Sequence, residues 1–506
     1  MNSKESAFLE TDDLAQAGQA ILSHLGILSD SKRYTLASHM ERANYRAVRN
    51  WLTKYQPKNE ATNLEKTRGF LESFYHLCKV AAWEEATEIM LLSVNVVNKK
   101  LEGSIIEPFH LQLGRWGYYT EQIHLYRYLL GNWTQETEMI CLNGLGLVHY
   151  NLGDYSSALK YHSQHLELAK EIYDSEAEQN ALCNLGNVYG SMGEYPTANS
   201  HYQKALILAR NDNDRQGEGK LLGNLGVLQR LQGNFSEAIA IQQQHLHTAL
   251  EIDDQVGTAN ALENLGVAHY YLGIYEIAKD LFQSSLQIST QIGDQQSIAA
   301  TLGSLGNVSM ALGDLQQSLQ YYCQQLDISR EIRYLEGEEK SLGNIGTVYK
   351  DMGNYEASLE YLQQKLLLAR QLQSREGEAY ALSNMGNTYT CLSQYEEAIQ
   401  CQKASIKIAH DIGDYWGYAA ALCNLGDAYR LSRKFDEAVI SLLNSMLNFD
   451  LLQSPQIETV MILLTQIAFE IGIEDYIELL ENHLVTIEKM YGKEIILKLR
   501  EHLFEE

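Results

Sequence analysis

The fold is decided by a stretch that recurs along the chain, and residues 182–198 show it in full: LCNLGNVYGSMGEYPTA. Its central glycine returns every 40 residues without a single insertion, at Gly146, Gly186, Gly226, Gly266, Gly306, Gly346, Gly386 and Gly426. A leucine keeps the same period from Leu142 to Leu422, and a small residue keeps it from Ala158 to Ala438. Positions that stay in phase over eight copies indicate a repeat architecture.

Each copy is predicted to form two helices. Leu222, Leu225, Gly226 and Gln229 have the spacing of one helical face, and the glycine lets a neighbouring helix come close. The pair 233–234, Gly-Asn, then breaks the first helix, and residues 235–250 supply the second. A Gly-Asp pair, as at 293–294, ends the second helix and begins the next copy.

The frame L-x-x-L-G-x-x-Y-x-x-x-G-x-Y-x-x-A resembles a tetratricopeptide repeat, and in one copy it is carried by Leu182, Leu185, Gly186, Tyr189, Gly193, Tyr195 and Ala198. The 40-residue length and the Asn-Leu-Gly opening are similar to the long-repeat subfamily of the Pins/LGN and rapsyn type. The resemblance covers 139–458. It implies an all-α fold, a right-handed α-α superhelical solenoid of about ten helix-turn-helix repeats.

The predicted organisation has four parts. Residues 1–66 are a helical, partly flexible segment, 67–138 are two degenerate repeats (67–102 and 103–138), 139–458 are eight regular repeats, and 459–506 are capping helices with an acidic outer face. In the first two parts, residues 41–52 and 74–86 resemble helical regions beside repeat arrays in bacterial signal-transducing NTPases, which favours a bacterial source.

The charge limits the partners. The chain has 39 Lys and Arg against 65 Asp and Glu, a formal net charge of −26. Nucleic acid and anionic membranes need a cationic footprint, so we expect neither as a general partner.

Cysteine use and hydropathy favour a cytoplasmic protein. The seven cysteines form no C-x-x-C pair, which is typical of reduced thiols. Residues 1–12 are polar and no apolar run approaches the length of a membrane span, so neither a signal peptide nor membrane insertion is expected.

No catalytic site, metal site or cofactor is predicted. Residues 217–221 and 337–341 look superficially like phosphate-binding loops, but they lack the G-x-x-x-x-G-K-[ST] spacing and belong to links between copies. His162 and His165 share a helix face without further metal ligands. Ser318 and Ser358 replace a packing alanine and are expected to be small core residues.

The resemblance implies that the first helices line a concave surface. Two residues before the recurrent glycine the chain carries Asn184, Asn224, Asn264, Asn344, Asn384 and Asn424, and one residue after it Asn187 and Asn387. Mid-helix asparagine has no propensity rationale. Its amide suits the N–H and C=O groups of an extended peptide, a role that such residues have in Pins/LGN-like arrays. Alternatively, these amides bond between neighbouring first helices and fix the stack.

Bases recur at two further inward positions, six residues before and four residues after the recurrent glycine. The bases found there are Lys220, Arg230, Lys340, Lys350 and Arg430, and no copy has an acid at either position. In a concave surface they would attract carboxylates. Alternatively, they neutralise link acids such as Glu218, Glu338 and Glu378.

These patterns predict a non-enzymatic scaffold or sensor that binds an extended, partly acidic segment of another protein. The alternative is a signalling receptor for a small peptide or metabolite, of the bacterial quorum-peptide kind, with regulatory helices in 1–66. An enzyme built on the array would need a cluster of acids, bases or metal ligands, which the sequence does not provide. The oligomeric state is left open.

Overall fold

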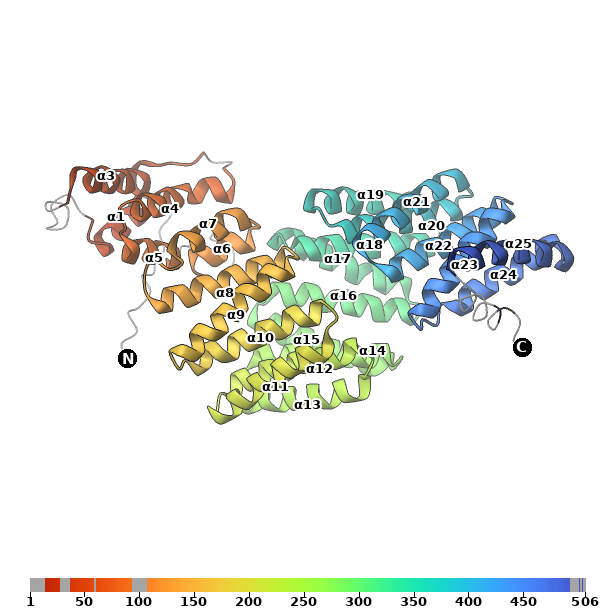
Figure 1. Cartoon of the computed structure of the whole chain (residues 1–506), viewed down its shortest axis with the longest axis horizontal. Helices are drawn as coiled ribbons and strands as arrows, with labels where there is room; N and C mark the ends of the chain where they lie inside the picture. The colour runs from red at the N-terminus through yellow and green to blue at the C-terminus, as the bar shows by residue number, and fades with distance from the viewer. Residues whose placement is uncertain are drawn as a thin grey trace. The chain divides into compact units, whose positions relative to one another are not determined.

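The computed structural model describes residues 14–27, 37–58, 61–92 and 107–491, together with residues 500 and 503. Every regular element in this part of the chain is a helix, and no strand is formed (Figure 1). The predicted all-α repeat fold is therefore confirmed. The chain divides into two compact units, 1–272 and 273–506, and each is described by itself.

The first unit contains the helices up to residue 272: α1 (Leu14–His24), α3 (His39–Lys54), α4 (Asn63–Cys78), α5 (Trp83–Leu91), α6 (Phe109–Arg115), α7 (Tyr119–Leu129), α8 (Gln135–Asn151), α9 (Tyr155–Glu171), α10 (Ser175–Ser191), α11 (Tyr195–Asn211), α12 (Arg215–Leu231), α13 (Phe235–Glu251) and α14 (Gln255–Tyr271).

The second unit contains α15 (Tyr275–Ile292), α16 (Gln295–Ala311), α17 (Leu315–Ile332), α18 (Leu335–Asp351), α19 (Tyr355–Leu372), α20 (Arg375–Cys391), α21 (Tyr395–Ile412), α22 (Tyr415–Leu431), α23 (Phe435–Leu451), α24 (Ile457–Ile471) and α25 (Ile473–Tyr491). From α8 to α23 the helices alternate between the predicted first and second helices of the copies.

The ends of these helices follow from local chemistry. Asp214 accepts a hydrogen bond from the amide of Gly217 and so caps α12, and Asp414 caps α22 in the same way. Gly293 adopts a left-handed conformation at the end of α15, as the Gly-Asp signal predicts. Pro196 lies in the first turn of α11, where the missing amide costs no hydrogen bond.

The recurrent glycines sit directly beneath a side chain of the following helix. A Cβ on Gly186 would lie 2.5 Å from the ring of Tyr202, and a Cβ on Gly306 would lie 2.5 Å from the ring of Tyr322. We call these recurrent residues the anchor glycines. Ser318 and Ser358 are fully buried, which confirms their prediction as small core residues.

The helices outside the regular array agree partly with the sequence. Helices α5 and α7 begin at Trp83 and Tyr119, within the segments 67–102 and 103–138 that were predicted to be degenerate repeats. On α24 and α25, acids such as Glu474 are exposed, but so is Phe469 at 92%. The predicted acidic outer face is therefore interrupted by apolar residues. Part of the predicted segments 1–66, 67–138 and 459–506 lies outside the described residues.

Candidate functional site

The first helices of the copies form the inner side of each unit. Neighbouring first helices contact each other, α8 with α10 and α10 with α12 in the first unit, and α16 with α18 and α18 with α20 in the second. Neighbouring second helices, from α9 to α13 and from α17 to α23, do not approach each other as closely. A stack whose first helices lie closer together curves toward them, so their free faces line its inner surface.

Three of the predicted asparagines bridge neighbouring first helices. The amide nitrogen of Asn184 donates to Oδ1 of Asn143 at 2.8 Å. That of Asn224 donates to the Cys183 sulfur at 3.2 Å, and that of Asn424 donates to the Ser383 hydroxyl at 3.3 Å. Each acceptor lies three residues before the anchor glycine of the preceding copy. We call Asn184, Asn224 and Asn424 the bridged asparagines, and they carry the stacking role that the sequence left as an alternative.

The other three, Asn264, Asn344 and Asn384, have no side-chain hydrogen bond within the described part of the chain, and we call them the unbridged asparagines. In each case the preceding copy has glycine at the acceptor position: Gly223, Gly303 and Gly343, which we call the gap glycines. A glycine offers no side chain to accept the bond. All three asparagines are half-buried, so their amides remain available on the inner surface.

The asparagines one residue after the anchor glycine are fixed by their own second helix. The Tyr202 hydroxyl donates to Oδ1 of Asn187 at 2.6 Å, and Nε2 of Gln402 donates to Oδ1 of Asn387 at 2.9 Å. Because both oxygens accept these bonds, the amide nitrogens of Asn187 and Asn387 remain as the donors that these positions can offer to a ligand.

Three of the predicted bases pair with acids. Lys340 Nζ lies 2.6 Å from Oε1 of Glu336, and Lys350 Nζ lies 3.0 Å from Oδ1 of Asp351. Arg430 binds Asp427 at 2.7 Å and also binds Glu470 of α24. These pairs reduce the positive charge that Lys340, Lys350 and Arg430 present to a ligand.

The two remaining bases have no ion pair among the described residues. Lys220 is exposed at the start of the inner face of α12. Arg230, at the other end of α12, has its guanidinium carbon 5.8 Å from the centre of the Tyr271 ring, and its buried Nε has no hydrogen-bond partner in the part of the chain that the structure describes. The helix α12 therefore carries the two predicted cations that are most available to an acidic ligand.

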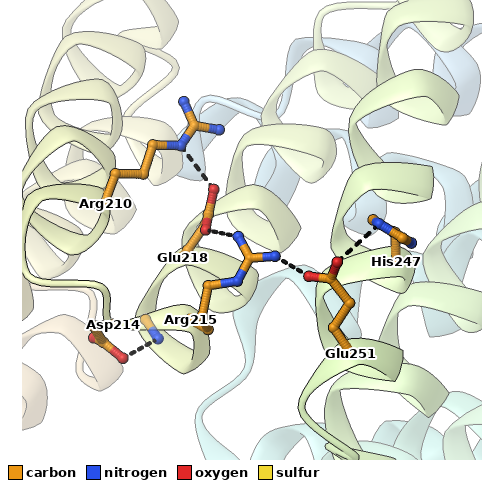
Figure 2. A network of polar contacts seen from close by, with 7 residues as sticks. Arg210, Asp214, Arg215, Glu218, His247 and Glu251 are labelled. Carbon is orange, nitrogen blue, oxygen red and sulfur yellow. Dashed lines mark hydrogen bonds and ion pairs between the residues drawn. The ribbon is translucent and has the colours of Figure 1, made fainter.

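The link acids named as partners of these bases are held by other arginines. Glu218 lies between Arg210 and Arg215, and Arg215 also binds Glu251 (Figure 2). The two ion pairs of Glu218 have N–O distances of 2.7 and 2.5 Å. Glu338 binds Arg330, and Glu378 binds both Arg370 and Arg375. The alternative interpretation of the inward bases is therefore wrong for these three glutamates, although Lys340 does pair with another link acid, Glu336.

Two cavities open beside the predicted asparagines, one in each unit. The first, of about 270 Å³, is lined by Asn384, Asn387 and Asn424 together with Tyr380, Asp414 and Trp416. Burial, followed by the charge of Asp414, raises the pKa of Tyr380 to about 12, so its hydroxyl stays a donor. The second, of about 190 Å³, is lined by Asn187, Asn224, Tyr150 and Tyr202.

Some lining residues were missed by the sequence analysis. Asp414 is the N-cap of α22 and Trp416 lies in the first turn of that helix, and these positions gave no sign of a cavity. The signal that could have found Ser383 is its place three residues before an anchor glycine.

The residues considered for metal or phosphate binding lie within helices, His162 and His165 in α9 and the two loop-like sequences in α12 and α18. No group of three metal-ligating side chains occurs among the described residues. His162 is 1% exposed, and burial, followed by the charge of His165, lowers its pKa to about 4. The sequences that resemble phosphate loops lie in the first turns of α12 and α18. None of the described helices has the length and apolarity needed to cross a membrane.

These features define a helical-repeat protein with a polar inner surface. The tetratricopeptide repeat model matches residues 138–211, 178–251, 217–291, 297–371 and 377–443, which together exceed half of the chain. The chain therefore belongs to the tetratricopeptide repeat family.

Several solved structures are similar to the chain. A signal transduction ATPase with numerous domains and a tetratricopeptide repeat sensor, from Pyrococcus horikoshii, is 16% identical, with 96% of this chain and 70% of that chain covered and a TM-score of 0.49. The apo quorum sensor NprR from B. thuringiensis is 16% identical, with 69% and 99% covered and a TM-score of 0.47.

Aspartyl phosphate phosphatase F from Bacillus subtilis is 14% identical, with 77% of this chain and 94% of that chain covered and a TM-score of 0.46. The comparison with curated proteins found no match. None of these likenesses assigns a function.

Proposed function

We propose that the protein is a non-enzymatic scaffold or sensor that binds an extended, partly acidic segment of another protein along the inner surface of its repeats. The observation that carries this proposal is the set of unbridged asparagines, which occupy the same register of their first helices: Asn264 in α14 of the first unit, and Asn344 and Asn384 in the neighbouring first helices α18 and α20 of the second. Each offers two donors and one acceptor, the groups that a peptide backbone needs when it is not paired in a sheet.

The preference for acidic segments rests on α12. Lys220 and Arg230 have no ion pair among the described residues, while the chain as a whole carries a formal charge of −26. A cation that is not neutralised by a neighbour is the one that gains most from an incoming carboxylate. Lys340, Lys350 and Arg430 would exchange an existing partner for the ligand and contribute less.

The remaining expectations belong to the same proposal. The 40-residue period and the Asn-Leu-Gly motif support a place in the Pins/LGN/rapsyn-like group, and the domain limits 1–66, 67–138, 139–458 and 459–506 are proposed as predicted. We also propose a cytoplasmic, bacterial protein that needs no cofactor and does not bind nucleic acid.

The test compares two triple variants of the full chain. The variant N264A/N344A/N384A should lose binding of extended peptides, measured by fluorescence anisotropy on an array of labelled acidic peptides, while its circular dichroism stays helical. The control N184A/N224A/N424A removes as many amides but should lower thermal stability and retain binding at a temperature below its transition. Equal loss of binding in both variants would contradict the proposal.

A second candidate, a receptor for a small peptide or metabolite acting through the helices in 1–66, is favoured by the cavity of about 270 Å³ at Tyr380 and Trp416. That volume suits one or two side chains or a small metabolite. This candidate predicts a change in compactness on ligand binding, measured by small-angle scattering. An unchanged scattering profile in the presence of a bound ligand would exclude it.

A further inference from the structure

The gap glycines make room for polar side chains that arrive from the second helices. A Cβ on Gly303 would lie 2.7 Å from Nε2 of Gln325, and a Cβ on Gly343 would lie 3.0 Å from Nζ of Lys365. At Gly223 the same test gives 3.1 Å to Cε1 of His245. In these three copies, the polar end of a second-helix residue therefore occupies the space that a side chain at the gap glycine would fill.

Copies with a gap glycine in the first helix also have a long polar residue at the facing position of the second helix. His245, Gln325 and Lys365 lie 19 residues after their anchor glycines, and in four of the five other copies this position is short: Ala205, Ser285, Ser405 and Ser445. Two of the short residues form their hydrogen bonds with the first helix of their own copy: the hydroxyls of Ser405 and Ser445 donate to the backbone carbonyls of Ala379 and Ala419, both at 2.8 Å. Only the first copy, with His165, departs from this pairing.

Gln325 is left with an unused acceptor. The residue is 4% exposed, and its Oε1 is buried with no hydrogen-bond partner in the described part of the chain. A buried acceptor without a partner is unfavourable, because it has lost its hydrogen bonds to water and gained none in the protein. Because this side-chain end lies against Gly303, where no side chain stands in the way, rotation of the Gln325 amide toward the inner surface would bring its oxygen to a donor there.

Within the described residues, the ion-pair partner of Lys365 is distant. Its Nζ lies 3.9 Å from Oε1 of Glu339, and the two side chains are 11% and 14% exposed. Burial lowers the pKa of Lys365 and raises that of Glu339, so neither charge is well compensated. A second carboxylate close to Nζ would supply the hydrogen bond that Glu339 does not make at this distance.

An unbridged asparagine lies beside each gap. Asn424 reaches Ser383, three residues before the anchor glycine of the preceding copy, and this register places Asn384 beside Gly343. The same register places Asn344 beside Gly303. In the second unit, each gap therefore brings together a free amide from one copy and a buried polar group from the copy before it.

We propose that α16–α20 contain two adjacent peptide subsites, Gly303–Gln325–Asn344 and Gly343–Lys365–Asn384, and that Lys365 receives an Asp or Glu side chain of the bound segment. Gln325 accepts a backbone N–H of the peptide, and the two asparagines hold its backbone on either side. The inference rests on the proposed function and adds to it the place and the chemistry of one side-chain contact.

The test uses the full chain and an array of ten-residue labelled peptides, each with one Asp or Glu in a background of Ser, Thr and Val. Every binder is compared with its Asn or Gln counterpart. K365Q introduces the residue that Gln325 provides in the preceding copy. It should weaken binding of the acidic peptide about tenfold and leave binding of the amide peptide unchanged. E339Q, which removes the competing carboxylate, should strengthen binding of the acidic peptide.

G343S transfers the Ser383 arrangement into α18. Its hydroxyl should capture Asn384, and the added atoms meet only the flexible end of Lys365. We expect weaker binding of both peptides and an unchanged helical signal. The inference is overturned if K365Q weakens the binding of acidic and amide peptides equally, or if it weakens the binding of neither. In both cases the proposed peptide binding would still hold. If no peptide binds the unmodified protein, the proposed function fails as well.

Discussion

The stretches α8–α12 and α16–α20 are built on one frame but differ at the contact between neighbouring first helices. In the first stretch, Asn184 and Asn224 bond to Asn143 and Cys183 of the preceding copy. In the second, Asn344 and Asn384 face Gly303 and Gly343 and form no such bond within the described residues. A change of one residue in the preceding copy therefore converts a stacking asparagine into an available one, so identical motifs need not have identical roles.

The largest effect should fall on the feature that both stretches share. Replacing Gly186 or Gly306 with Ala places a Cβ 2.5 Å from a tyrosine ring, which forces the second helix outward. We expect each variant to lose about 2 kcal/mol of unfolding free energy, measured by urea denaturation.

The control lies in the same helix as Gly186. A Cβ on Gly190 would meet its nearest neighbours at 3.9 Å, so G190A keeps the packing and improves helix propensity. It should gain about 0.5–1 kcal/mol. Equal destabilisation by G186A and G190A would show that the anchor glycines do not act through close packing.

The second-helix residue that packs on the anchor glycine should give the two stretches a different dependence of stability on pH. His162 in α9 has a pKa lowered from 6.5 to about 4, chiefly by burial, whereas the second stretch has Tyr322 and Leu362 at this position. Below pH 6.5 the unfolded chain takes up a proton that folded His162 refuses, so stability falls as pH falls from 6.5 toward 4. The cost reaches about 2 kcal/mol at pH 5.

H162Q tests this response, because Gln242 and Gln402 show that glutamine fits the position. The slope of the unfolding free energy against pH reports how many protons the chain takes up on unfolding. Between pH 6.5 and 4, this number should be smaller by about one in the variant. Chemical denaturation at several pH values measures the slope. An unchanged slope would mean that His162 is charged in the folded protein.

The asparagines themselves should show a smaller contrast in stability. N184A removes a bridge between α8 and α10 and leaves Oδ1 of Asn143 without this donor, which should cost about 1 kcal/mol. N344A removes no side-chain hydrogen bond in the described part of the chain and should change the thermal transition by less than a third of that shift. If both variants melt alike, the distinction between bridged and unbridged asparagines is not energetic.

The smallest effect concerns the links. Asn213 in the first stretch and Gln373 in the second both have left-handed backbones, with φ of 55° and 56°. Asparagine tolerates this conformation better than glutamine does. Q373G should therefore raise the unfolding free energy by about 0.5–1 kcal/mol, and N213G by less. The reverse order in thermal melting would contradict this account of the links.

The repeat frame could be predicted from the sequence because its period is set by local signals. The second helix expected at 235–250 is observed as Phe235–Glu251, and Gly293 ends α15 in the left-handed conformation that the Gly-Asp signal requires. The division of the asparagines could not be predicted in the same way. It depends on which residue stands 41 positions earlier across the stack, and that register becomes visible only when the helices are packed.

Ion pairs between different helices could not be predicted from the sequence either. Arg430 was predicted as an inward base, yet it binds Glu470, 40 residues later in α24. The partners of Glu218, Glu338 and Glu378 are arginines that the inward-facing pattern did not include. Long charged side chains choose among several acids within reach, and their sequence spacing does not identify the choice.

The uninterrupted 40-residue period has a consequence for how such a chain can change over generations. Each helix pair contacts its neighbours in the stack, so unequal recombination that adds or removes one whole period rejoins equivalent surfaces and opens no hole in the core. An insertion of any other length between an anchor glycine and its second helix would shift the side chain that packs on that glycine and disturb the packing of that copy. The number of copies is therefore free to drift, while the length of each copy is held constant.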